Sequence, residues 1–190
     1  MKLLDTDLAV QPSRSKVTVW HCYEKTTKEN AQMRYTILAS PVGELLLTAD
    51  EGGLRQLYWE KSRHPALIGA DWQRDDQALA EVRDQLGEYF AGRRREFELR
   101  LNPRGSVFQK RVWDALMEIP YGETTSYGRL AAKLGQPTAA RAVGLANGQN
   151  PLSIIVPCHR VIGADGSLTG YGGGLPTKKF LLSLEAASIP

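Results

Sequence analysis

Residues 126–163 read SYGRLAAKLGQPTAARAVGLANGQNPLSIIVPCHRVIG. Two segments of this stretch have the composition of short helices, Tyr127–Leu134 and Thr138–Asn147, and Thr138 is a residue type that caps helix N-termini. The Gly-Gln-Pro turn between them gives the pair helix-turn-helix spacing. The apolar run Leu152–Val156 follows and predicts a strand-like segment directly ahead of a cysteine motif.

The second of these helices is rich in small side chains, and Arg141 stands alone among them. Small residues let a helix backbone approach a partner closely, including a narrow minor groove, where one arginine can reach into the base stack. Tight packing against another helix explains the same pattern, so both interpretations stay open. The small residues are Ala139, Ala140, Ala142, Gly144 and Ala146.

Cys158 follows the apolar run and Pro157, and it precedes two basic residues, His159 and Arg160. The thiolate is the nucleophilic form of cysteine, so a reactive cysteine needs a group that lowers its pKa or accepts its proton. Adjacent side chains on an extended strand point apart, so Cys158 and His159 cooperate only if the chain turns here. Glu185, the one acidic residue beyond Gly166, is the candidate to orient His159. A cysteine buried in the core without a chemical role is the alternative.

A glycine-rich loop, Ser167–Gly174, follows this motif and precedes an amphipathic helix predicted over Thr177–Ala186. Glycines let a flat ligand approach the backbone closely, and Tyr171 is placed to stack on such a ligand. The loop lacks the spacing and the lysine of a phosphate-binding P-loop. On the other side of the stretch, Ser106 is the expected cap of a helix that runs to Ile119.

The first half of the chain predicts an antiparallel meander of three segments with tight turns, Arg34–Ala39, Glu44–Ala49 and Leu54–Trp59. A helical period over Gln77–Phe90 and an alternating segment, Phe97–Leu101, complete this lobe. We therefore divide the chain into an N-terminal extension (1–32), an N-terminal lobe (33–101) and a second domain (106–188).

Three segments of the first half are less regular. The extension is polar, with a short strand expected at Val17–Trp20, and residues 61–75 are expected to be irregular. The basic run Arg93–Arg95 fits a solvated helix end, favoured by the helix dipole, better than a contact with phosphate.

The charge distribution favours the second half as the part that meets a polyanion. Residues 1–100 hold 15 Lys and Arg against 16 Asp and Glu, a net charge of −1, whereas residues 101–190 hold 9 against 5, a net charge of +4. The two cysteines, Cys22 and Cys158, form neither a disulfide framework nor a four-ligand zinc site, so we expect no metal and no cofactor. No segment predicts a membrane span or a signal peptide, which favours a cytoplasmic protein, and we expect a monomer.

Taken together, these motifs resemble the methylated-DNA–protein-cysteine methyltransferases, also called O6-alkylguanine-DNA alkyltransferases. The resemblance covers nearly all of residues 106–188, is looser over 33–101 and is absent from 1–32. It is carried by Phe108-Gln109, Ile119-Pro120-Tyr121-Gly122, Ser126-Tyr127-Gly128, Ala140-Arg141-Ala142-Val143-Gly144, Asn150-Pro151, Pro157-Cys158-His159-Arg160-Val161 and Gly170-Tyr171-Gly172-Gly173-Gly174.

The resemblance implies an α+β fold: a small N-terminal lobe with a ribonuclease H-like antiparallel sheet and a helix, then a mostly helical domain of winged helix-turn-helix type that carries the active site. It implies that Cys158 accepts the alkyl group, that His159 is the water-mediated base, that Glu185 orients His159, and that Asn150 is the hinge between the helix-turn-helix and the active-site turn.

The resemblance also implies that double-stranded DNA carrying an O6-alkylguanine is the partner, with the damaged base flipped out through the minor groove. Arg141 would fill the gap in the stack, Tyr127 would rotate the 3′ phosphate and bond the guanine, and the small residues Ala140 and Gly144 would face the DNA. The remaining roles concern the base pocket: the carbonyls of Cys158 and Val161 would accept from the exocyclic amine, and the pocket would be completed by Tyr171, Gly172 and Lys178.

The implied reaction moves the alkyl group irreversibly to Cys158, once per protein molecule, and O4-methylthymine is a second candidate substrate. Some relatives have serine at the position of Gly172, which removes a hydroxyl contact here, and Cys22, His21 and His64 are too few and too poorly spaced for a family zinc site. Two other functions remain as alternatives: a damage-binding protein without chemistry, and a helix-turn-helix transcription factor, which leaves the cysteine motif unused.

Overall fold

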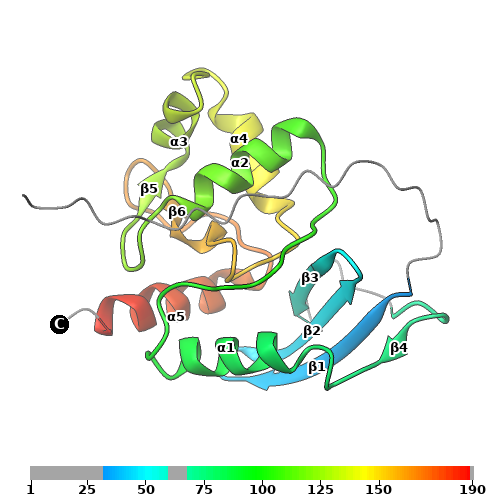
Figure 1. Ribbon diagram of the computed structural model, residues 1–190. Helices are drawn as coiled ribbons and strands as arrows, with labels where there is room; N and C mark the ends of the chain where they lie inside the picture. Colours follow the sequence, from blue (N-terminus) through cyan, green and yellow to red (C-terminus); the bar gives the residue numbers. More distant parts are fainter. Residues whose placement is uncertain (1–31, 60–67, 189–190) are drawn as a thin grey trace, which may run out of the picture.

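The computed structural model of the protein describes residues 32–59 and 68–188 (Figure 1). The strand expected at Val17–Trp20 and the residues Cys22, His21 and His64 lie outside these ranges. In chain order the elements are β1 (Arg34–Ser40), β2 (Gly43–Asp50), β3 (Gly53–Trp59), β4 (Gln73–Arg74), α1 (Ala80–Phe90), α2 (Val107–Met117), β5 (Thr125–Ser126), α3 (Tyr127–Lys133), α4 (Ala140–Gly148), a 3₁₀ turn (Cys158–Arg160), β6 (Val161–Ile162) and α5 (Gly174–Ala187).

The N-terminal lobe is a four-stranded sheet of order β3-β2-β1-β4 with α1 packed beside it (Figure 1). The predicted meander is confirmed, because β1 pairs antiparallel with β2 and β2 with β3. Gly43 and Gly53, which open β2 and β3, have φ angles of 100° and 126°, which L side chains rarely adopt. Helix α1 buries Val82, Leu86 and Tyr89, the face that the helical period predicted.

Two expectations for this lobe are wrong. Phe97–Leu101 does not form a strand, because the segment pairs with β3 only through a single bridge between Leu101 and Leu54. The stretch expected to be irregular contains the two-residue strand β4, which runs parallel to β1 and pairs Gln73 with Arg34. Both differences come from short contacts between distant segments, which local periodicity does not encode.

The helices of the second domain follow the predicted order, with differences at their ends. Ser106 caps α2 in a capping box with Gln109, as the sequence predicts. Thr138 is not a cap, because α4 begins at Ala140 and has no side-chain cap. Helix α5 begins at Gly174, ahead of the predicted start, since Pro176 in the first turn has no N–H that needs an intrahelical partner.

The segment Leu152–Val156 is a buried turn and not the expected strand-like run. The Val156 N–H donates to the Leu152 carbonyl at 2.8 Å, and Ile154 has a φ of 74°, a conformation that costs energy for a β-branched residue. Leu152 in this turn also forms an isolated β-bridge with Leu57 of β3, so the turn joins the two lobes. One apolar core runs through both lobes and includes Leu57, Trp113 of α2 and Cys158 itself.

Candidate active site

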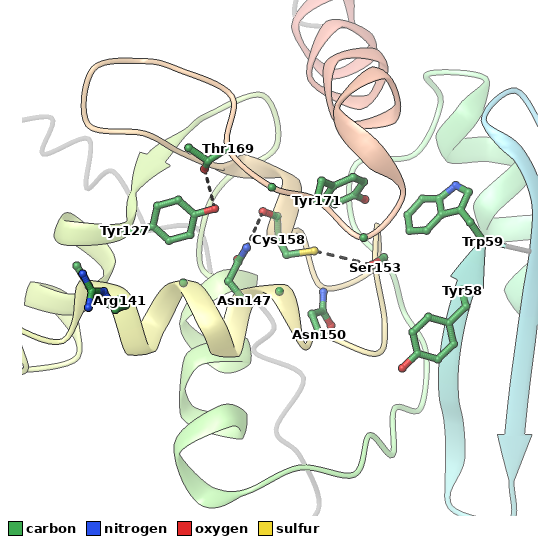
Figure 2. A pocket seen from close by; sticks show the side chains of 15 residues that line it. Tyr58, Trp59, Tyr127, Arg141, Asn147, Asn150, Ser153, Cys158, Thr169 and Tyr171 are labelled. Atoms are coloured by element: carbon green, nitrogen blue, oxygen red, sulfur yellow. Dashed lines mark hydrogen bonds between the residues drawn. The ribbon is translucent and has the colours of Figure 1, made fainter. Parts of the chain in front are cut away.

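A cavity of about 560 Å³ opens between α4, the glycine-rich loop and the end of β3, and Cys158 lies in its wall (Figure 2). The sequence singled out several of the residues that line it: Tyr127, Ala140, Arg141, Gly144, Asn150, Cys158, Tyr171 and Gly172. It did not single out the others: Tyr58, Trp59, Asn147, Gly148, Ser153, Thr169 and Gly170. His159, Glu185, Val161 and Lys178 lie behind this lining and do not form part of it.

Cys158 begins a 3₁₀ turn, which supplies the change of direction that cooperation with His159 requires. The side chain is only 3% exposed, and its Sγ lies 3.9 Å from the Ser153 hydroxyl oxygen (Figure 2). Burial raises the pKa of the Cys158 thiol, whereas the Asn150 amide, the Ser153 hydroxyl and the charge of Lys178 act to lower it. The thiol of the free protein is therefore protonated at neutral pH.

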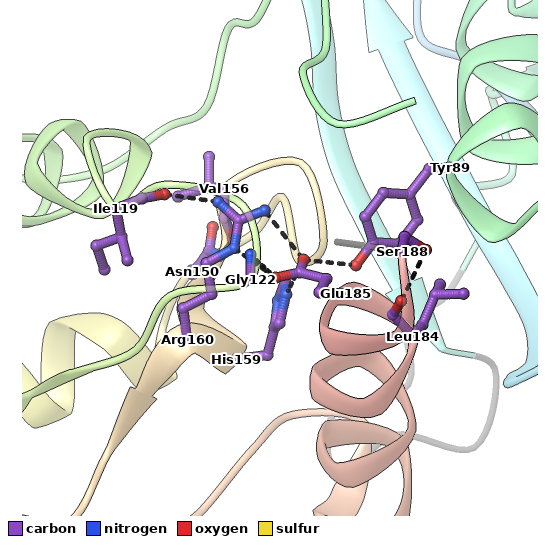
Figure 3. A network of polar contacts seen from close by, with 10 residues as sticks. All are labelled: Tyr89, Ile119, Gly122, Asn150, Val156, His159, Arg160, Leu184, Glu185 and Ser188. Atoms are coloured by element: carbon purple, nitrogen blue, oxygen red, sulfur yellow. Dashed lines mark hydrogen bonds and ion pairs between the residues drawn. The ribbon is translucent and has the colours of Figure 1, made fainter. Parts of the chain in front are cut away.

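His159, the residue after Cys158, forms a buried pair with Glu185 (Figure 3). The distance from His159 Nε2 to Glu185 Oε1 is 2.8 Å, so the pairing expected from the sequence is present. Burial opposes ionisation of Glu185, but hydrogen bonds from His159 and Arg160 outweigh it and lower the pKa of Glu185 to about 2. An ionised Glu185 accepts the Nε2–H of His159, which leaves Nδ1, buried and without a partner in the described structure, as the basic nitrogen.

Arg160, the other basic residue that the sequence places beside Cys158, bonds to this carboxylate and not to the cysteine. Its Nε and one terminal nitrogen donate to Glu185 at 2.9 and 3.0 Å, and the other terminal nitrogen donates to the Ile119 carbonyl at 2.7 Å. Glu185 also accepts from the Tyr89 hydroxyl at 2.8 Å and from the Gly122 N–H at 3.1 Å (Figure 3). These donors explain how a carboxylate can stay ionised inside the protein.

Asn150 holds the turn that presents the cysteine. Its amide Nδ2 donates to the Val156 carbonyl at 2.8 Å, and its Oδ1 accepts from the Leu152 N–H at 2.9 Å. Because Asn150 lies two residues after the end of α4, these two bonds fix the position of the helix-turn-helix relative to Cys158. A hinge role for Asn150, which the family resemblance implies, would depend on these two bonds.

The α4 side of the cavity is formed by an exposed Arg141 and by the small residues Ala140 and Gly144. The Tyr127 ring, on α3, lies against Gly144, where an added Cβ would come within 3.5 Å of it. The Tyr127 hydroxyl accepts a 3.1 Å hydrogen bond from Thr169 in the opposite wall (Figure 2). The small side chains therefore leave room at the cavity mouth, where Arg141 reaches into solvent.

The loop side is fixed by aromatic packing against the N-terminal lobe. The rings of Tyr171 and Trp59 pack edge to face with centroids 5.4 Å apart, and a Cβ on Gly173 would come within 2.9 Å of the Trp59 ring. A Cβ on Gly172, in contrast, would meet no atom within 4 Å, so its backbone faces open space. Gly173 thus allows the loop to pack closely against Trp59, whereas Gly172 leaves its own backbone accessible.

Lys178 and Val161 support the site from behind. The Lys178 ammonium, buried on α5, donates to the Val161 carbonyl at 2.6 Å and to the Thr169 carbonyl at 3.0 Å. Burial lowers the pKa of Lys178, whereas the nearby Cys158 raises it. The lysine therefore fastens the glycine-rich loop to the strand that follows the cysteine.

Comparisons with known proteins agree with this geometry. Residues 33–103 match the ribonuclease-like domain, and residues 107–187 the DNA-binding domain, of the 6-O-methylguanine DNA methyltransferase family. The chain belongs to this family. The methylated-DNA–protein-cysteine methyltransferase of Methanosarcina acetivorans is 50% identical over 155 residues, covering 82% of this chain and 99% of the relative, and that of Mycolicibacterium paratuberculosis is 52% identical over 159 residues, covering 83% and 95%.

Solved structures of the family have the same fold. The crystal structure of the Mycobacterium tuberculosis O6-methylguanine methyltransferase matches with a TM-score of 0.78 and 50% identity over 84% of this chain and 96% of that one. A structure of that protein in complex with DNA matches with a TM-score of 0.76 and 51% identity over 83% and 95%. The predicted fold class, an antiparallel ribonuclease-like lobe followed by a helical DNA-binding domain, is confirmed.

The residues of the cavity that the sequence did not reveal have weak local signals. Ser153 lies inside an apolar run, and Asn147 ends a helix of small residues, so neither stands out by composition. Tyr58 and Trp59 belong to the other lobe, and only the tertiary fold brings them to the cavity. In the described part of the chain, no three His, Cys, Asp or Glu side chains lie close enough together to hold a metal ion, and no helix is long and apolar enough to cross a membrane.

Proposed function

We propose that this protein repairs DNA by transferring the alkyl group of O6-methylguanine to its own Cys158. The observation that carries the proposal is the position of the Cys158 sulfur, in the wall of a cavity that is also lined by α4, the second helix of the helix-turn-helix (Figure 2). A methylated O6 atom lies inside the duplex, so a cavity beside a helix-turn-helix fits a base that has been flipped out of the stack.

The acid–base unit of the reaction is Cys158, His159 and Glu185. Glu185 accepts the Nε2–H of His159, and His159 Nδ1 then receives the thiol proton through a bridging water. Ionised Glu185 stabilises the imidazolium that forms. The buried thiol thus becomes a nucleophile by giving its proton to His159.

The thiolate of Cys158 attacks the alkyl carbon in line, the S–C bond forms, the O6–C bond breaks, and the electron pair of that bond goes to O6. The guanine takes up a proton at N1, which restores its ordinary form and matches the proton that the thiol lost. The product is a thioether, a poor leaving group, and Cys158 is the only cysteine in the described part of the chain. Each molecule therefore reacts once.

The remaining residues bind DNA and the flipped base. Arg141 fills the gap in the base stack, while Ala140 and Gly144 allow the backbone of α4 to enter the minor groove. Tyr127 contacts the 3′ phosphate and the base. Asn150 couples this helix to the turn that carries Cys158.

The base pocket is completed from the loop side. Tyr171 walls the base, and the Gly172 N–H is directed at O6, where it stabilises the charge that develops on the leaving oxygen. The Val161 carbonyl accepts from the base, and Lys178 holds that carbonyl in place. A reactive, single-use thiol must stay reduced, which favours the reducing cytoplasm as its place of action.

Mass spectrometry tests the proposal directly. After incubation with duplex DNA that contains one O6-methylguanine, we expect the protein to gain the mass of one CH₂ group, and peptide mapping to place it on Cys158 and not on Cys22. A Cys158→Ala variant is the control and gains nothing. An unchanged mass after long incubation with excess DNA would refute the proposal.

A further inference from the structure

Asn147 is a buried polar residue of the cavity that the mechanism above does not use. It lies on α4, only 3% exposed, on the face that also buries Val143 and Ala146. Unlike these neighbours it carries an amide, which points toward the Cys158 carbonyl and into the cavity (Figure 2).

The amide of Asn147 is only half satisfied. Its Nδ2 donates to the Cys158 carbonyl over a long distance, 3.5 Å, and its Oδ1 is buried with no hydrogen-bond partner in the described structure. Buried amide oxygens are nearly always paired in folded proteins, so an unpaired one that lines a cavity indicates a donor supplied by the occupant.

The occupant that the proposed function supplies has a single kind of donor. An O6-alkylguanine presents N7 and N3 as acceptors, its N1 carries no hydrogen, and its O6 bears the alkyl group. The exocyclic amine at position 2 is the only N–H group on the base. An acceptor oxygen in this cavity can therefore pair with the base in one way only.

The amine has two hydrogens, and each of the two backbone carbonyls expected to receive it can accept a second hydrogen bond, so a side-chain acceptor can act beside them. The Val161 carbonyl accepts from Lys178 at 2.6 Å, and the Cys158 carbonyl accepts from Asn147 itself. The side-chain oxygen of Asn147 is left as a free acceptor next to the reactive cysteine.

We propose that Asn147 reads the damaged base, with its Oδ1 accepting a hydrogen bond from the exocyclic amine while its Nδ2 stays on the Cys158 carbonyl. The inference rests on the proposed function and assigns to α4 a second task besides entering the groove. One amide then links the position of the base to the backbone of the nucleophile. It also favours guanine over O4-methylthymine, which has no N–H group on its ring edge.

The test compares two substrates that differ only in this amine. Single-turnover rate constants for transfer to the full-length protein are measured with duplexes that contain O6-methylguanine or O6-methylhypoxanthine, which lacks the 2-amino group. We expect replacement of Asn147 by leucine to reduce the preference for the guanine substrate about tenfold, the effect of one hydrogen bond. Differences in the ease of base flipping cancel, because each variant is compared with the wild type on both substrates.

Gln149→Leu provides the matched control, because Gln149 is an exposed amide at the end of the same helix and bonds only to Gln109 in the described structure. Its substrate preference is expected to equal that of the wild type. Asn147→Ala is measured beside Asn147→Leu, so that a folding defect of one variant does not decide the result. An unchanged preference in the Asn147 variants overturns the inference, whereas absence of any transfer by the wild type from O6-methylguanine overturns the proposed function.

Discussion

The hydroxyl of Tyr89, on α1 in the N-terminal lobe, donates a 2.8 Å hydrogen bond to Glu185 Oε1, the same oxygen atom that meets His159 Nε2. Tyr89 is fully buried, and its aromatic neighbours Phe90, Phe97 and Tyr121 hold the ring in place. The N-terminal lobe therefore does more than pack against the second domain. It helps to orient the Glu185 carboxylate, which in turn orients His159, the proposed general base.

Replacing Tyr89 by phenylalanine removes this donor and keeps the ring. We expect the free energy of unfolding to fall by about 1 to 2 kcal/mol, because a buried charge loses a hydrogen bond, and alkyl transfer to slow severalfold. Urea unfolding and single-turnover transfer measure the two effects. Tyr121→Phe is the matched control, because the Tyr121 hydroxyl is buried without a partner in the described structure. Equal losses in both variants would contradict a specific role for the bond.

Glu185 is expected to make stability depend on acid pH. Its pKa is about 2 in the folded protein against a usual value of 4.5, so its ionised form stabilises the fold fully above about pH 4.5, and this contribution is lost as the pH falls through about 2. The difference corresponds to about 3 kcal/mol. Urea unfolding measured across this window should show a steeper loss for the wild type than for Glu185→Gln.

At neutral pH, Glu185→Gln leaves the buried Arg160 without its counter-charge, which we expect to cost about 3 to 5 kcal/mol. Glu118→Gln is the control, because the pair of Glu118 with Lys133 is exposed and is worth less than about 1 kcal/mol. Equal stability of the two variants at neutral pH would show that the Glu185 network is not held as the structure indicates.

The sequence predicted those parts of the fold that depend on local patterns. The meander follows from alternation and glycine turns, α2 from its capping box, and the helix-turn-helix from a Gly turn between two short periodic segments. The Glu185–His159 contact could be predicted because the second half of the chain contains so few acidic residues that elimination led to Glu185.

The rest depends on contacts between distant segments. The run Leu152–Val156 is as apolar as a strand, but it forms a turn because Asn150 binds both of its ends and Ile154 adopts a positive φ. The direction of Arg160 depends on its contacts with Glu185 and Ile119, far away in the sequence, and the arrival of Trp59 at the cavity depends on how the two lobes pack. Periodicity within one segment contains none of this information.

Ser153 is expected to help ionise Cys158. Its hydroxyl lies 3.9 Å from the sulfur, a long contact of the kind that shortens when a charged reaction partner forms. Ser153→Ala removes a donor to the thiolate, so we expect the pKa of Cys158 to rise further and alkylation by iodoacetamide at neutral pH to slow about tenfold, the effect of one hydrogen bond. Lys178, whose charge also lowers the pKa of Cys158, is unchanged in this variant, whereas Tyr171 loses an interaction with the Ser153 hydroxyl that lowers its own pKa.

The rate of alkylation, measured as a function of pH, separates this effect from a loss of structure. The wild type and the Ser153→Ala variant are expected to react equally fast at a pH well above the pKa of the Cys158 thiol in either protein. Their rates are expected to differ only at lower pH. Ser167→Ala is the control, since Ser167 is exposed and its hydroxyl bonds to Asp165. A uniform slowing at all pH values would mean that Ser153 shapes access to the sulfur and not its ionisation.

Arg141 is expected to act on the duplex and not on the chemistry. Because it is exposed at the cavity mouth and has no hydrogen-bond partner or ion-pair partner in the described structure, Arg141→Ala removes the group proposed to replace the flipped base and leaves Cys158, His159 and Glu185 in place. We expect transfer from O6-methylguanine in a duplex to slow at least about tenfold, since base unstacking costs a few kcal/mol. Transfer from the free base O6-benzylguanine, which needs no flipping, is expected to be unchanged.

Arg93→Ala, which removes an exposed arginine of the N-terminal lobe, controls for the general loss of one positive charge. If the Arg141 variant reacted more slowly with the free base as well, the arginine would have to belong to the reactive site itself, and another residue would have to hold the gap in the stack.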